Sequence, residues 1–247
     1  MRLRKPSGLA IVLVMGVAVI LTLTLISAAH ALTLRLSDGA TTVVVNDGDP
    51  ADQCPGPGCV TFSGPVGDFT VNITTGLSRP VTPGAQLQLS SVDVFSALGG
   101  PTQLEIDLTD IGFSLPGPAA KTLISNISGS LSAPAGSTLD ASQCVGFDNL
   151  AFGCVPGVTL THPTFGPGGI SDTQTGPFTT VAPFAITETV TLAFSGAGLA
   201  QFTLTSTAVT AAIAAVPQPR ALLLLGLGLA GLWALPMLRA SRRGRDD

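Results

Sequence analysis

Apolar and polar residues alternate with a period of two through much of the chain. The alternation is clearest over five runs, at residues 32–37, 68–74, 103–109, 186–195 and 201–205. A period of two is typical of a β-strand that buries one face and exposes the other. Clusters rich in glycine, proline, aspartate and serine separate the runs, and the body of the chain has no sustained 3.6-residue period of an amphipathic helix.

These runs predict an all-β fold, an antiparallel β-sandwich of about nine to eleven strands in a single domain over residues 32–215. One face of each strand is expected to pack on the partner sheet, while the threonine-rich face meets water. The eleven phenylalanines of the chain all lie in this body and supply large core side chains. Residues 195–198, Ser-Gly-Ala-Gly, are predicted to form a hairpin turn between two long strands.

Residues 1–31 have the three parts of a secretory signal peptide. A cationic start at 2–5 is followed by an almost purely apolar run over 9–26, and Ala29 and Ala31 are the small residues of an A-x-A cleavage site. This pattern predicts cleavage after Ala31. The alternative is an uncleaved membrane anchor, because the apolar run is long for a signal; in both cases the body is exported.

A second apolar segment, residues 221–238, contains no charged residue and would be roughly 27 Å long as a helix, enough to cross the hydrocarbon core of a bilayer. The alternative is a buried core helix. A basic cluster follows directly, made of Arg239, Arg242, Arg243 and Arg245. By the positive-inside rule this cluster stays in the cytoplasm, which places the body on the far side of the inner membrane.

A short proline motif, Val216-Pro217-Gln218-Pro219, stands immediately before this segment and is expected to be extended. The C-terminal region resembles the PEP-CTERM sorting signal, because it has a proline motif, then a Leu/Gly-rich helix, and then an arginine cluster. Gln218 occupies the place where that family usually has glutamate. The resemblance covers residues 216–245 and implies that an exosortase-type enzyme recognises the tail and removes it. By this resemblance 216–219 are substrate residues, and the body is released to the cell surface or to an exopolysaccharide matrix.

The charge of −4 is unevenly distributed. Residues 32–215 carry three basic and thirteen acidic side chains, a net −10, whereas 1–31 and 216–247 each carry +3. Because the body has no basic surface, nucleic acid is excluded as a partner.

The four cysteines, Cys54, Cys59, Cys144 and Cys154, all lie in the exported part, where disulfides persist. Three pairings are open. Local pairing of Cys54 with Cys59 and of Cys144 with Cys154 is the simplest, since the Pro-Gly-Pro-Gly stretch between the first two turns sharply. The alternative, a zinc site, is disfavoured because zinc prefers closer pairs and histidine, and the body has only His162.

An acidic loop over 46–52 offers oxygen ligands of the kind that calcium prefers. The best metal candidates are Asp38, Asp47, Asp49 and Asp52. The loop lacks the spacing of an EF-hand, so the alternative is a solvated turn. No other cofactor is indicated.

Candidate catalytic groups are few. Glu105 and Asp107 share one face of a strand, whereas glycoside hydrolysis needs two carboxylates on opposite sides of a sugar, so a solvated pair is expected. Glu188 falls on the apolar face of its strand, either at a sheet edge or as a buried, partnered acid. His162 has no nucleophile motif such as G-x-S-x-G nearby and is expected to be an ordinary strand-end histidine. The body also lacks Trp and Tyr, which argues against a lectin.

The sequence therefore predicts a non-enzymatic, exported structural or interaction protein of the cell surface or exopolysaccharide matrix. Its expected partners are the sorting enzyme, the inner membrane before processing, and exopolysaccharide. The alternatives are a calcium-dependent module that binds a sugar or a protein, and a hydrolase that uses Glu105 and Asp107.

Overall fold

A computed structural model describes residues 32–79, 81–82, 84–98, 100, 102–116, 120–180 and 183–210. All of them belong to one compact unit, Met1–Ala211. The predicted signal peptide with Ala29 and Ala31, and the sorting tail with residues 216–219, 221–238 and 239–245, lie outside the described residues. Within the described ranges, no helix is long and apolar enough to cross a bilayer.

The described chain is all-β. Its twelve strands are β1 (Thr33–Ser37), β2 (Thr42–Asn46), β3 (Cys59–Val66), β4 (Phe69–Leu77), β5 (Ala85–Ser96), β6 (Thr102–Phe113), β7 (Ala120–Ser132), β8 (Thr138–Gly146), β9 (Gly157–Thr161), β10 (Gly168–Thr179), β11 (Phe184–Phe194) and β12 (Gly198–Thr210).

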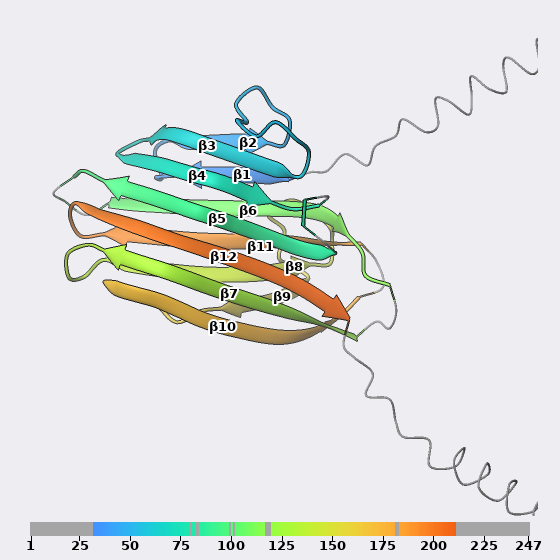
Figure 1. Ribbon diagram of the computed structural model, residues 1–247. Helices are drawn as coiled ribbons and strands as arrows, with labels where there is room; N and C mark the ends of the chain where they lie inside the picture. Colours follow the sequence, from blue (N-terminus) through green and yellow to red (C-terminus); the bar gives the residue numbers. More distant parts are fainter. Residues whose placement is uncertain are drawn as a thin grey trace, which may run out of the picture. The chain divides into compact units, whose positions relative to one another are not determined.

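The strands form two antiparallel sheets of six, in the orders β2-β1-β6-β11-β8-β9 and β10-β7-β12-β5-β4-β3. Figure 1 shows one sheet in front of the other, which confirms the predicted sandwich. The strand number exceeds the expected nine to eleven. Short strands such as β2 explain the difference, because its three consecutive valines, 43–45, do not alternate.

The segment 195–198 is not a hairpin turn, contrary to the prediction. It joins β11 to β12, and these two strands lie in different sheets. The chain makes the same change of sheet between β5 and β6 and between β7 and β8. A Gly-rich turn can close a hairpin or arch over the core, and the local sequence does not distinguish the two.

The core lies between the sheets and contains the apolar positions of the alternating runs. Leu34, Ile73, Ile106 and Leu192 are fully buried, as the alternation predicts. Phenylalanine rings pack at the end of the core near the close of β6, where the rings of Phe113 and Phe184 lie 5.9 Å apart. Burial of these side chains is the main source of stability, at about 25 cal/mol for each Å² of apolar surface.

Both disulfides join neighbouring cysteines, which confirms the local pairing. Cys54, which precedes β3, bonds to Cys59, the first residue of β3. Cys144 of β8 bonds to Cys154, which lies in the segment between β8 and β9. The described part of the chain contains no free cysteine. The cysteines are therefore used as crosslinks and not as zinc ligands.

Candidate functional site

Two of the four candidate calcium ligands bind backbone of their own turns. The Asp38 carboxylate accepts hydrogen bonds from the N–H groups of Thr41 and Ala40, and these bonds lower the pKa of Asp38. Asp49 accepts from the backbone and side-chain nitrogens of Asn46. These carboxylates stabilise tight turns, as aspartate commonly does.

The other two candidates, Asp47 and Asp52, connect the acidic loop to the start of β3. Asp47 accepts from the N–H of Gly58, and Asp52 accepts from those of Cys54 and Thr61. Among the residues that the structure describes, no group of three or more His, Cys, Asp and Glu side chains is arranged to hold a metal ion. The four aspartates are accordingly spread over separate turn contacts and do not converge on one point.

The carboxylates of Glu105 and Asp107 do share one face of β6, but Asp107 is not solvated. It is 3% exposed and accepts hydrogen bonds from the Arg35 guanidinium at 2.7 and 2.9 Å and from the Thr189 hydroxyl at 2.7 Å. Glu105 lies 3.3 Å from the same guanidinium. Its pKa is raised, first by a hydrogen bond with Asp107 and then by burial.

A loop covers this charged cluster, and the second disulfide closes it. Phe152 lies over the Arg35 guanidinium with 4.5 Å between the charge centre and the ring centre. The backbone N–H of Phe152 donates to Thr109 on β6, and Asn149 of the same loop accepts from Gly112. Because Cys144–Cys154 ties both ends of the loop together, the loop is held over Arg35 and Asp107, whereas Glu105 beside them stays partly exposed.

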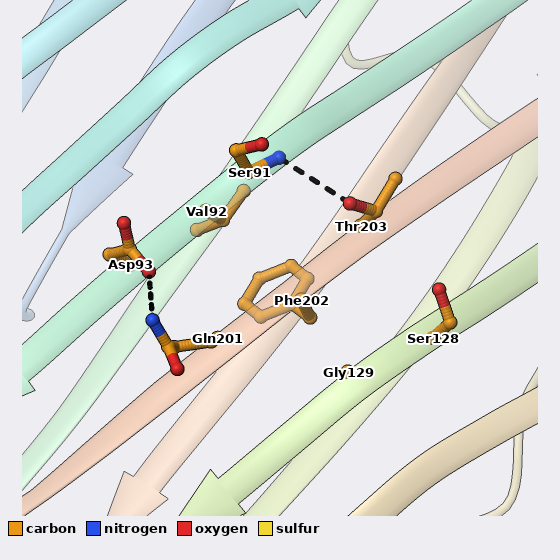
Figure 2. A pocket seen from close by; sticks show the side chains of 8 residues that line it. All are labelled: Ser91, Val92, Asp93, Ser128, Gly129, Gln201, Phe202 and Thr203. Carbon is orange, nitrogen blue, oxygen red and sulfur yellow. Dashed lines mark hydrogen bonds between the residues drawn. The ribbon is translucent and has the colours of Figure 1, made fainter.

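The outer face of the other sheet is open, and it carries a groove of about 500 Å³ across β5, β12 and β7. Asp93 accepts a hydrogen bond from the Gln201 side chain at 2.7 Å, and Thr203 accepts from the backbone N–H of Ser91. Figure 2 shows these two pairs on either side of Phe202, the buried ring that forms part of the floor. The groove therefore has an apolar floor between polar walls.

An irregularity in the sheet makes the groove. The register of β12 on β5 shifts between Phe202 and Leu204, so that two residues of β5 face Thr203. Ser91, in this bulge, has a left-handed φ of 49°. On the other side Gly129 of β7 allows a close approach of β7 to β12, because a Cβ there would come within 2.1 Å of the Gln201 carbonyl oxygen. Bulges often re-aim side chains at functional sites.

The groove belongs to a wider polar surface. One row of cross-strand neighbours crosses five strands and consists of Ser130, Gln201, Asp93, Asn72 and Ser63. Phe95 stands two residues from Asp93 on the same face of β5 and is 47% exposed. We define the groove residues, this row and Phe95 as the polar face. It offers hydroxyls, amides, one carboxylate and one aromatic ring to the solvent.

The core contains a polar network that the sequence did not reveal. The Ser125 hydroxyl of β7 lies 2.7 Å from His162 Nε2, and His162 Nδ1 lies 2.7 Å from the Asp172 carboxylate of β10. Gln174 also donates to Asp172 at 2.8 Å. These two contacts lower the pKa of Asp172, the one from Gln174 most. His162 is thus more than an ordinary strand-end residue.

Next to this network, two further polar side chains are buried. Glu188 of β11 is fully buried and lies in a central strand, so it is not at a sheet edge. One of its oxygens accepts from the backbone N–H of Leu89 across the core, and its other neighbour is Ser206. Burial raises the pKa of Glu188 well above its usual range. Gln143 of β8 pairs with Glu188 in register.

Sequence reasoning could have found part of this. A polar residue at an inward position of an alternating strand is a visible signal, and it identified Glu188. The same test, applied to 120–132, would have selected Ser125. Nothing local links Ser125, His162 and Asp172, because the three come from β7, the end of β9 and β10.

No known family model matches this sequence, and no protein of curated function does. Among solved structures, the adhesin domain of Epf from Streptococcus pyogenes aligns over 74% of this chain with 14% identity and a TM-score of 0.38. This chain spans 62% of the length of that adhesin domain. The xylan-binding domain CBM22-1 of Paenibacillus barcinonensis Xyn10C aligns over 66% of this chain and 92% of its own length, with 12% identity and a TM-score of 0.27. Likeness at this level carries no information about function, which has to come from the chain's own residues.

Proposed function

We propose that this is an exported interaction protein of the cell surface or extracellular matrix, and that it binds matrix polysaccharide on its polar face. The observation that carries the proposal is the open groove between the pairs Asp93–Gln201 and Ser91–Thr203. Binding sites are typically concave, with an apolar floor and a few fixed polar groups, and this groove has both.

The chemistry of the polar face suits a neutral or weakly charged sugar. Hydroxyl and amide groups donate and accept hydrogen bonds, as sugar hydroxyls need, and Asp93 adds a strong acceptor. Phe95 supplies an exposed ring on which the apolar face of a sugar can stack. The lack of Trp and Tyr is therefore a weaker objection to sugar binding than the sequence suggested.

Export is supported by the two disulfides, since such bonds persist in oxidising compartments and are rare in the cytosol. We propose in addition that the PEP-CTERM-like tail, with residues 216–219 and the basic cluster 239–245, sends the protein through an exosortase. The test is the intact mass of the secreted protein from cells with and without that enzyme. A tail that is lost only in cells that have the enzyme would support sorting. A tail that is retained in both kinds of cells would contradict it.

The binding proposal is tested with polysaccharide extracted from the matrix of the producing cells, by isothermal titration. Gln201→Ala removes the partner of Asp93 and is expected to weaken binding at least tenfold. Thr175→Ala is the control, because Thr175 is exposed on edge strand β10 of the same sheet and away from the groove. Equal affinities of the two variants would count against the groove.

Calcium is not required in this proposal. The carboxylates of Asp38, Asp47, Asp49 and Asp52 accept hydrogen bonds from their own turns and do not lie in the groove. The same titration, run with EDTA and then with calcium, is expected to give one affinity. Binding that disappears in EDTA would instead support the calcium-dependent module.

A further inference from the structure

The Ser125–His162–Asp172 network has the order of contacts that activates a serine hydroxyl in many hydrolases, but it is turned the wrong way for an external substrate. Ser125 is 0% exposed and His162 3%, whereas the Asp172 side chain is 24% exposed. In a hydrolase the nucleophile meets the solvent and the carboxylate is buried. Any electrophile for Ser125 must therefore belong to the core itself.

The contacts of the two ring nitrogens suit one tautomer of the histidine. Asp172 is a carboxylate and can only accept, so His162 Nδ1 carries the proton that joins them. In the tautomer with its only proton on Nδ1, Nε2 is an acceptor to which the Ser125 hydroxyl can donate. This is the tautomer in which the histidine can take up the hydroxyl proton as a general base.

The electrophile that the core offers is the side-chain amide of Gln143. It is 1% exposed, and neither its amide nitrogen nor its amide oxygen has a hydrogen-bond partner among the described residues. An unpaired buried amide costs about 1–3 kcal/mol for each group and is rare in folded proteins. The Gln143 amide therefore needs an explanation.

The strand register relates the positions of Gln143 and Ser125. On one sheet Ser125 pairs with Ser206, and on the other Gln143 pairs with Glu188. Glu188 lies beside Ser206 across the core. The partners of these two residues are Ser125 on β7 and Gln143 on β8, and we infer that β7 and β8 face each other across the core.

His162 connects the same two places. Its backbone N–H donates to the Ala141 carbonyl of β8, two residues from Gln143, while its ring bonds to Ser125 of β7. Leu160, two residues before His162, is the cross-strand partner of Gln143. The base thus contacts the hydroxyl directly, and its backbone is bonded to the strand that carries Gln143.

We propose that Ser125 and Gln143 react with each other after folding and form an ester crosslink between β7 and β8. The Ser125 oxygen attacks Cδ of Gln143, and His162 Nε2 takes the hydroxyl proton. His162 then returns that proton to the amide nitrogen as the C–N bond breaks. One ester bond replaces one amide bond and one ammonia is released, so no oxidant or other reactant is needed.

Glu188 is suited to assist as a positioning acid. Burial raises the pKa of its carboxyl and so favours the uncharged form. One of its oxygens has no partner within the described chain. A neutral carboxyl beside Gln143 can donate a hydrogen bond to the amide oxygen, where negative charge develops during the attack. The product would also remove the unpaired amide nitrogen from the core.

The test is mass spectrometry of the full chain after export and folding. A protease digest is expected to contain a β7 peptide joined to a β8 peptide, lighter than the sum of the two by one ammonia. Hydroxylamine, which cleaves esters, is expected to separate them and leave a hydroxamate at position 143. Separate peptides with an intact Gln143 amide, from protein that melts cooperatively, would overturn the proposal.

Variants locate the reaction. Ser125→Ala and Gln143→Met are each expected to abolish the linked peptide, and Ser128→Ala, an exposed position on the same strand, is expected to retain it. Ammonia loss that persists in Ser125→Ala would also overturn the proposal. If either core variant fails to accumulate, the wild-type digest decides by itself. Glu188→Gln is expected to slow formation of the link in a refolding time course without preventing it.

Discussion

Two aspartates occupy comparable places on opposite outer faces of the sandwich. Asp107 lies in β6 and is held by Arg35 and Thr189, while Asp93 lies in β5 and is held by Gln201. Each is on the polar side of an alternating strand. The difference is coverage, because the loop closed by Cys144–Cys154 lies over the first and nothing in the described chain covers the second.

This difference assigns different tasks to similar side chains. A covered charge pair contributes to stability, since removing one partner leaves the other incompletely solvated. An open pair contributes little to stability, because water replaces the lost partner. We therefore expect the covered face to respond to mutation in its stability and the open face to respond in its binding.

The largest effect is expected from the disulfide that holds the covering loop. Replacing both Cys144 and Cys154 by serine should lower the free energy of unfolding by roughly 2–3 kcal/mol, measured by urea denaturation. The loss of the loop should also make Asp107 accessible. The double variant at Cys54 and Cys59 is the control, since it should lose a similar or smaller amount without affecting Arg35. Equal stability of wild type and the Cys144/Cys154 variant would show that the loop is not a structural cover.

The matched pair of aspartates comes next. Asp107→Ala should cost about 2 kcal/mol of unfolding free energy, because it removes bonds to Arg35 and Thr189 in a buried place. Asp93→Ala should cost no more than about 0.5 kcal/mol. The same denaturation experiment measures both. Equal losses of unfolding free energy at the two positions would show that the loop does not make Asp107 structurally more important than Asp93.

A third carboxylate extends the comparison to complete burial. The pKa of Glu188 is raised, so the folded protein holds this proton more tightly than the unfolded chain does. The contribution of Glu188 to the free energy of unfolding is then largest below the pKa of the unfolded chain, about 4.3. It decreases as the pH rises toward the pKa of Glu188 in the folded protein. Glu188→Gln should remove that slope and stabilise the protein at pH 8 by on the order of 1 kcal/mol. Parallel stability curves against pH for wild type and variant would contradict this.

Much of the fold could be predicted from the sequence, because strand alternation is a local property. The runs around Leu34, Ile73, Ile106 and Leu192 are all buried strands, and cysteines five and ten residues apart do pair. What failed was the course of the chain between strands. The segment 195–198 joins two sheets, and its composition would suit a hairpin equally well.

The sites were harder to predict, since both depend on contacts between distant residues. Asp107 was expected to be solvated because its cover comes from a loop more than forty residues later, with Phe152 at its centre. The groove depends on a bulge at Ser91 and a glycine at 129, which come together only in the folded sheet. The sorting signals at the two ends remain predictions from the sequence.

We propose that the open polar face, and not the covered one, binds matrix polysaccharide. The most direct measurement is a titration of matrix polysaccharide into wild type, Asp93→Ala and Asp107→Asn, each checked for folding by circular dichroism. We predict that Asp93→Ala loses at least tenfold in affinity and that Asp107→Asn binds as tightly as wild type. Loss of affinity in Asp107→Asn alone, or no binding by wild type, would contradict the account.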